Sequence, residues 1–157
     1  MRRENLFALL VFDLIAITTI NAQTTIPGGY VSGTWKASSS PYLIQGNITI
    51  HADSVLAIEP GVKVNFQGYY SLAVEGTLNA VGRSQDSIIF TAANIVTGWQ
   101  GIRIGEGADS TRLDYCIIDH GINTGMSYGG GIFCASASTA ISRSEERRVG
   151  KECRSRW

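Results

Sequence analysis

The chain has few of the residues that build metal and redox sites. It contains three cysteines and two histidines among 157 residues. His51 has no partner at the spacing of a metal site, and no overall pattern of Cys and His residues suggests zinc. We therefore predict no metal site and no bound cofactor.

An excess of charge of one sign is also lacking. The formal net charge is zero, and residues 23–142 carry five Lys or Arg against eight Asp or Glu, a net charge of −3. A mildly acidic segment disfavours a nucleic-acid partner. With only three prolines the chain is not proline-rich, and no stretch repeats apolar residues at a helical period.

The first 22 residues have the layout of a secretory signal peptide. Arg2 and Arg3 precede an apolar run from Leu6 to Ile20, and Ala22 offers a small residue for cleavage. The run is interrupted by Asp13 and is shorter than the roughly 20 apolar residues of a membrane span. We favour export over a retained anchor, and expect a secreted or cell-surface protein without a membrane span in the mature chain.

Short apolar runs bounded by turn residues fill residues 41–142. They read NITI, VLAI, VKVNF, SLAV, SIIF, GIRI, LDYCII and GIFC. Val62, Val64 and Phe66 alternate with polar residues, as in a strand with one buried face. The pattern predicts an all-β fold. Strands this short, with tight corners and a repeat near 20 residues, favour a solenoid over a β-sandwich built from hairpins.

The succession LAIEPGVKVNFQG, LAVEGTLNAVGRSQDSIIFTA, GWQGIRI and GGGIFC resembles the opening coils of secreted bacterial right-handed parallel β-helix proteins of the pectin-lyase-like superfamily. The resemblance implies three parallel sheets around an apolar interior, with a capping strand before the first coil. Residues 23–40 are then a linker and capping strand, with the cap at 30–35. Residues 41–142 are the coils of an incomplete β-helix.

The same superfamily includes pectate lyases and polysaccharide hydrolases, so catalytic residues are expected if the chain is an enzyme. A lyase needs carboxylates that hold Ca²⁺ and a basic residue, and a hydrolase needs clustered carboxyls. The weak candidates are Arg103, Asp114, Asp119 and His120. The spacing of the aspartates does not place them on one strand face, and corner Asp residues usually bond locally. We therefore expect no catalytic site in this segment, and Ca²⁺ only if the lyase alternative holds.

Four aromatic residues are weak candidates for stacking on a ligand: Tyr69, Tyr70, Trp99 and Tyr128. The competing interpretation is that they cover coil ends and loops. Cys116 and Cys134 lie 18 residues apart, near one predicted coil. Export permits a disulfide between them. Two unbridged thiols stacked in the interior fit the same spacing, and we slightly favour this alternative.

Residues 143–157, RSEERRVGKECRSRW, break the strand pattern and carry six Lys or Arg against three Glu. A DNA string that encodes this segment without a mismatch resembles a common sequencing adapter. We predict that the segment is a translated artefact, and exclude it from the fold.

Together these features predict a secreted or cell-surface β-helix scaffold with a structural, glycan-binding or adhesive role. Its partners would be extracellular polysaccharides or cell-surface components. The alternative is the N-terminal part of a polysaccharide lyase or glycoside hydrolase whose active site lies in further coils. Activity on acidic polysaccharides distinguishes the two.

Overall fold

A computed structural model describes residues 22–124, 130–135 and 139–147. The predicted signal peptide before Ala22, together with Tyr128, lies outside these residues. The described part contains sixteen β-strands, one short 3₁₀ turn (η1, Ala37–Ser39) and no α-helix.

The strands form three parallel sheets. Sheet A contains β1 (Thr24–Ile26), β4 (Tyr42–Ile44), β7 (Lys63–Phe66), β10 (Ile88–Ala92), β13 (Cys116–Asp119) and β16 (Glu145–Arg147). Sheet B contains β2 (Gly29–Tyr30), β5 (Ile48–Ile50), β8 (Ser71–Val74), β11 (Gly101–Ile104) and β14 (Ile132–Cys134). Sheet C contains β3 (Gly33–Trp35), β6 (Val55–Ile58), β9 (Thr77–Val81), β12 (Arg112–Asp114) and β15 (Ala140–Ser142).

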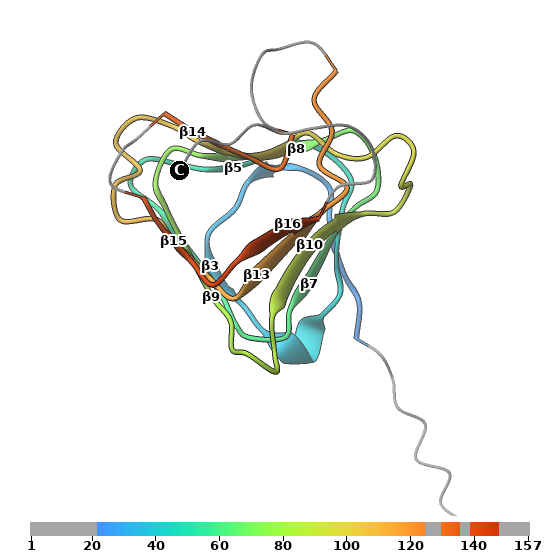
Figure 1. Ribbon diagram of the computed structural model, residues 1–157, viewed down its shortest axis with the longest axis horizontal. Coiled ribbons are helices and arrows are strands. Elements are labelled where there is room, and N and C mark those ends of the chain that lie inside the picture. The colour runs from blue at the N-terminus through green and yellow to red at the C-terminus, as the bar shows by residue number, and fades with distance from the viewer. Residues whose placement is uncertain (1–21, 125–129, 136–138, 148–157) are drawn as a thin grey trace, which may run out of the picture.

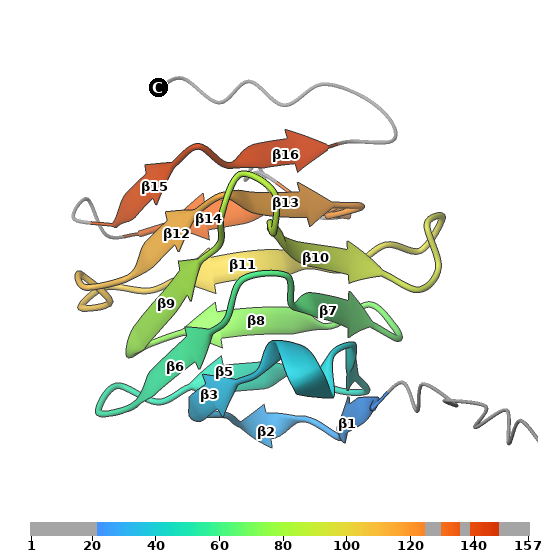
Figure 2. The ribbon, with the colours of Figure 1, turned by 90° about the horizontal axis from the view of Figure 1, so that it is seen from below.

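Each strand pairs in parallel with the strand that comes three strands later in the sequence. The chain thus visits sheets A, B and C in turn and climbs by one strand spacing, about 4.8 Å, per coil. Figure 1 shows the triangular cross-section and the right-handed winding, and Figure 2 shows the coils stacked from β1 to β16. The predicted right-handed parallel β-helix is confirmed, and its parallel pairing excludes a sandwich of hairpins.

The interior is filled by alternate residues of every sheet. Val64 and Phe66 on β7, and Leu72 and Val74 on β8, have no exposed surface, while the residues between them face outward. Each fully buried aliphatic or aromatic side chain contributes roughly 1.5–3 kcal/mol. The predicted alternation of Val62, Val64 and Phe66 is confirmed, since all three are buried.

The residues before position 41 are organised differently from the expected linker and single cap. Thr24 to Trp35 form three strands, β1, β2 and β3, which pair with β4, β5 and β6. After β3, residues 36–40 contain η1 and no strand. Residues 24–35 therefore form a first coil. They can do so with few apolar side chains because strand pairing uses backbone groups, and those of β4, β5 and β6 need partners.

Two further expectations need correction. The run LDYCII is not one strand, because Tyr115 adopts a positive φ of 49° and turns the chain from β12 in sheet C to β13 in sheet A. The coils are also not uniform. Thr24 pairs with Tyr42, 18 positions on, whereas Ala80 pairs with Leu113, 33 positions on. The additional residues lie in the corners between strands.

Candidate functional site

Three successive corners join sheet A to sheet B and stack along one edge of the solenoid. They comprise residues 67–70 between β7 and β8, 93–100 between β10 and β11, and the residues that follow β13, described as far as Thr124. We call residues 67–70, 93–100 and 120–124 the loop corner. In Figure 2 the loop after β10 projects from this edge. Two of the four catalytic candidates and three of the four aromatic candidates fall in or next to it.

Trp99 is the internal anchor of the loop corner. Its side chain has no exposed surface, and its ring stacks on Phe66 at 4.1 Å and on Phe90 at 6.4 Å between centroids. The indole N–H donates to Asp119 O at 2.8 Å. Trp99, a weak candidate for stacking on a ligand, therefore presents no exposed ring to one, because its indole lies in the core.

Asp119 and His120 are brought together at the end of β13. Asp119 Oδ2 lies 3.0 Å from His120 Nδ1, and the hydroxyl oxygen of Thr91 lies 3.3 Å from the same nitrogen. The His120 backbone has a φ of 58°, and its carbonyl accepts the Trp99 N–H at 3.2 Å. The two side chains are only 25% and 15% exposed. The pair holds the turn and packs Trp99, which agrees with the structural interpretation of these residues.

The two tyrosines of the loop corner have different environments. The hydroxyl of Tyr69 donates to Ile122 O at 3.0 Å, and its oxygen accepts the backbone N–H of Thr124 at 3.2 Å. The Gln100 amide donates to Tyr69 O at 2.9 Å. Tyr70 packs partly against the core. Tyr69 therefore ties three successive corners together, and both rings are half-buried rather than displayed.

The loop tip at Ile95 and Val96 was not predicted. Asn94 Oδ1 accepts the backbone N–H groups of Val96 at 2.9 Å and Thr97 at 3.1 Å, an Asx turn that orders the tip. Ile95 is 55% exposed and Val96 is 84% exposed. The sequence signal for an exposed tip was Asn94, which is followed by two apolar residues outside any predicted strand. Apolar residues after a turn-forming Asn need not face the core.

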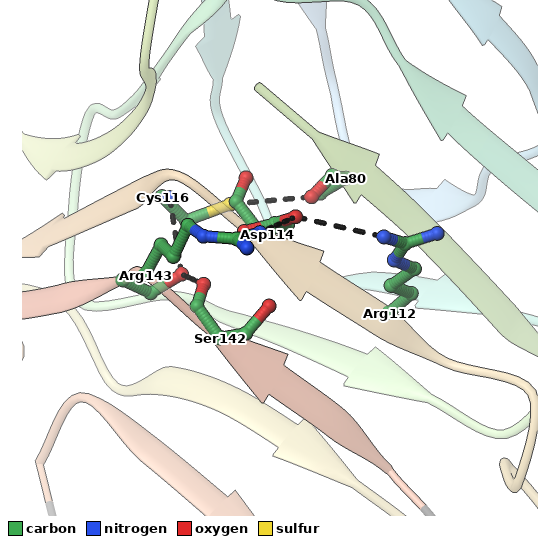
Figure 3. Close-up of polar contacts among 7 residues, drawn as sticks. Ala80, Arg112, Asp114, Cys116, Ser142 and Arg143 are labelled. Carbon is green, nitrogen blue, oxygen red and sulfur yellow. Dashed lines mark hydrogen bonds and ion pairs between the residues drawn. The ribbon is translucent and has the colours of Figure 1, made fainter. Parts of the chain in front are cut away.

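Asp114 lies away from this corner, at the end of β12, where the chain passes from sheet C to sheet A (Figure 3). Its side chain is 5% exposed, and Oδ2 lies 3.5 Å from Arg112 and 3.4 Å from Arg143. Oδ1 has no hydrogen-bond partner among the described residues. Both arginines are more than half exposed, so each ion pair contributes about 0–1 kcal/mol. Asp114 is enclosed by protein atoms and has no surface to offer a substrate.

Arg103 occupies a third location, on the outer face of β11 in sheet B, where it pairs in register with Ala73 and Phe133. The catalytic candidates therefore do not form one constellation; only Asp119 and His120 touch.

No group of three or more His, Cys, Asp or Glu side chains in the described part of the chain could hold a metal ion. No helix within those residues is long and apolar enough to cross a membrane.

The two cysteines of the solenoid are separate free thiols. Cys116 lies on β13 of sheet A and Cys134 on β14 of sheet B, so the 18-residue spacing does not stack them and the candidate disulfide is absent. Burial raises the pKa of the Cys116 thiol to about 12, and its Sγ donates to Ala80 O at 3.4 Å. Burial also raises the pKa of Cys134, although this side chain reaches solvent.

The fold and its corners define a parallel β-solenoid protein. No family model matches the chain, and no solved structure matches it. The chain is similar to a protein named bark beetle from Drosophila melanogaster, with 27% identity over 103 residues. The match covers 59% of this chain and 3% of that protein. The chain therefore spans a small fraction of the relative's length.

Proposed function

We propose that this protein is a secreted or cell-surface β-solenoid scaffold that binds a glycan or an adhesion partner through the loop corner. The observation that carries the proposal is the chemistry of the exposed loops. The loop corner contains no Asp, Glu, Lys or Arg, and His120 is its one imidazole, whereas corners at the other edges carry Asp53, Glu75, Arg83 and Glu106. A neutral surface of amides, hydroxyls and apolar groups suits an uncharged ligand.

The loop corner is also preorganised for binding. Tyr69 links the corners of three successive coils, and Asn94 holds the Ile95–Val96 tip in a hydrogen-bonded turn. Exposed β-branched side chains on an ordered turn lose little conformational entropy when a partner covers them. Because most of their surface is exposed, Ile95 and Val96 contribute little burial to the isolated scaffold.

Export is the second part of the proposal and rests on the sequence of residues 1–22. A positive start, an apolar run and a terminal alanine favour a cleaved signal peptide. Expression of the full chain in a secreting host would release a product that begins near Gln23, as read by N-terminal sequencing. Retention of the segment in a membrane fraction would contradict this part.

Binding is tested with the full chain on an array of neutral glycans, acidic glycans and extracellular proteins. The double variant Ile95→Ser/Val96→Ser removes the apolar tip without touching the core, and Lys63→Ser on the outer face of sheet A is the control. We expect the tip variant to lose binding and the control to retain it. Unchanged binding by the tip variant would place the site elsewhere. Turnover of acidic polysaccharides, with or without Ca²⁺, would favour the enzyme alternative.

We also propose that residues 143–157 are not native. Strand β16 pairs with β13, and Ser144 Oγ accepts the Cys116 N–H at 3.1 Å. Parallel pairing uses backbone groups that any residue except proline offers, so it carries no information on the origin of the segment. Long-read sequencing of the locus tests the proposal, and finding the same codons inside an uninterrupted gene would overturn it.

A further inference from the structure

The first coil displays an aromatic ring that the loop corner does not use. Tyr30, at the end of β2, is 76% exposed. Its backbone is fixed on both sides, because the Gly29 N–H donates to Asn47 O at 2.8 Å and the Val31 N–H donates to Thr49 O at 2.9 Å. The ring is therefore held at a defined place on the surface although most of it faces solvent.

The His51 ring of the next coil contacts the Tyr30 ring, and Asp53 contacts His51. The His51 ring meets Tyr30 nearly perpendicularly, at 5.6 Å between centroids and 80°. The Asp53 N–H donates to His51 Nδ1 at 3.4 Å, so Nε2 carries the proton of the neutral imidazole and is a donor. The Asp53 side chain is 95% exposed and the His51 side chain 52% exposed. We call Tyr30, His51 and Asp53 the Tyr30 platform.

We propose that the Tyr30 platform is a binding subsite for a neutral saccharide. An aromatic ring offers an apolar face to the C–H groups of a sugar, while the imidazole N–H and the Asp53 carboxylate offer a donor and an acceptor to its hydroxyls. The proposal rests on the proposed extracellular binding role and adds a ligand class and a second location.

The charge around the platform selects against an anionic sugar. Asp53 is one carboxylate, and Glu75 starts the corner of the next coil, where its N–H donates to Ile50 O beside His51 at 2.9 Å. A uronic acid or sulfated sugar would bring a further negative charge against both. A neutral hexose polymer meets no such repulsion, which is why we commit to this class.

The test measures binding of the full chain to a neutral β-glucan hexasaccharide by calorimetry, with oligogalacturonate as the anionic counterpart. Tyr30→Ala removes the ring, Tyr30→Phe retains it, and Lys63→Ser on the outer face of sheet A is the control outside both the platform and the loop corner. We expect Tyr30→Ala to weaken neutral-glucan binding about tenfold or more, Tyr30→Phe to bind nearly as the parent, and oligogalacturonate to bind more weakly than the glucan.

Each other outcome overturns the inference. Equal binding by Tyr30→Ala and the parent would remove the platform as a site, and stronger binding of oligogalacturonate would remove the neutral class. If no neutral glucan binds, the inference fails, while the loop corner is still judged separately by its own tip variant. Circular dichroism of Tyr30→Ala, expected to match the parent, separates a lost contact from a lost fold.

Discussion

At the residue scale, the interior of the solenoid is tied to its surface loops through Trp99. The indole fills the space between Phe66 and Phe90 and bonds to the Asp119 carbonyl. Asp119 and His120 are consequently parts of a packed corner. Asp119 and His120, whose side chains could act in acid–base catalysis, are thus held in place by a core tryptophan.

Substitution of Trp99 should therefore be costly. Trp99→Ala leaves a cavity beside two phenylalanines, and we expect a loss of about 3–5 kcal/mol in the free energy of unfolding. Trp99→Phe retains most of the stacking and gives up one hydrogen bond, so its loss should be smaller, about 1–3 kcal/mol. Urea unfolding followed by circular dichroism measures both. Equal stability of Trp99→Ala and the parent would contradict the packing described above.

The two solenoid thiols should differ in reactivity. Burial keeps Cys116 protonated well above pH 8, because its pKa is raised to about 12, and only a thiolate attacks a disulfide reagent. In a Cys153→Ser variant, which leaves Cys116 and Cys134, Ellman's reagent at pH 8 should react with one thiol in the folded protein. Two thiols should react in guanidinium. Two fast-reacting thiols without denaturant would show that Cys116 is accessible.

At the element scale, the strands are short because tight corners interrupt them. Gly76 lies where β8 turns into β9, and a Cβ atom there would overlap His51 O and Ser54 O of the coil below. One coil later the corresponding corner begins with Gly105, where a Cβ atom would have Val74 O at 3.4 Å. The close approach of coils, rather than an unusual φ, requires the glycine at position 76.

This difference predicts the effect of two matched substitutions. Gly76→Ala forces backbone against backbone, so we expect a loss of about 1–3 kcal/mol in stability. Gly105→Ala makes an ordinary contact in the same kind of corner, and we expect a change within about 0.5 kcal/mol. Thermal unfolding of the two variants side by side measures the contrast. Similar melting temperatures for both would mean that the coils can move apart at little cost.

At the scale of the whole molecule, the end strands of all three sheets have one edge that no strand of the described residues pairs with. In a polypeptide of residues 23–142, β1, β2 and β3 at one end and β13, β14 and β15 at the other each lack a pairing strand on one side. Unpaired strand edges and the apolar interior between them favour edge-to-edge association. We expect this polypeptide to form oligomers or aggregates at micromolar concentration in size-exclusion chromatography with light scattering. A monodisperse monomer would contradict the prediction.

The sequence by itself determined the fold class. Alternation at VKVNF and SLAV defines a buried and a solvent-facing side, and such short runs with tight corners favour a parallel solenoid with an apolar interior over hairpins. It did not reveal that residues 24–35 form a coil of their own, because their few apolar side chains give no alternation and their pairing depends on backbone groups supplied by β4, β5 and β6.

Only the tertiary structure decided which residues meet. Loops of unequal length separate Cys116 from Cys134, and the turn at Tyr115 places Asp114 at the end of β12 and Asp119 at the end of β13. The same stacking joins Tyr69 to residues more than fifty positions later and sets Tyr30 beside His51. A sequence shows the period of each strand, since that is local. The register between coils depends on how many residues each corner absorbs, and this is determined by packing across the whole solenoid.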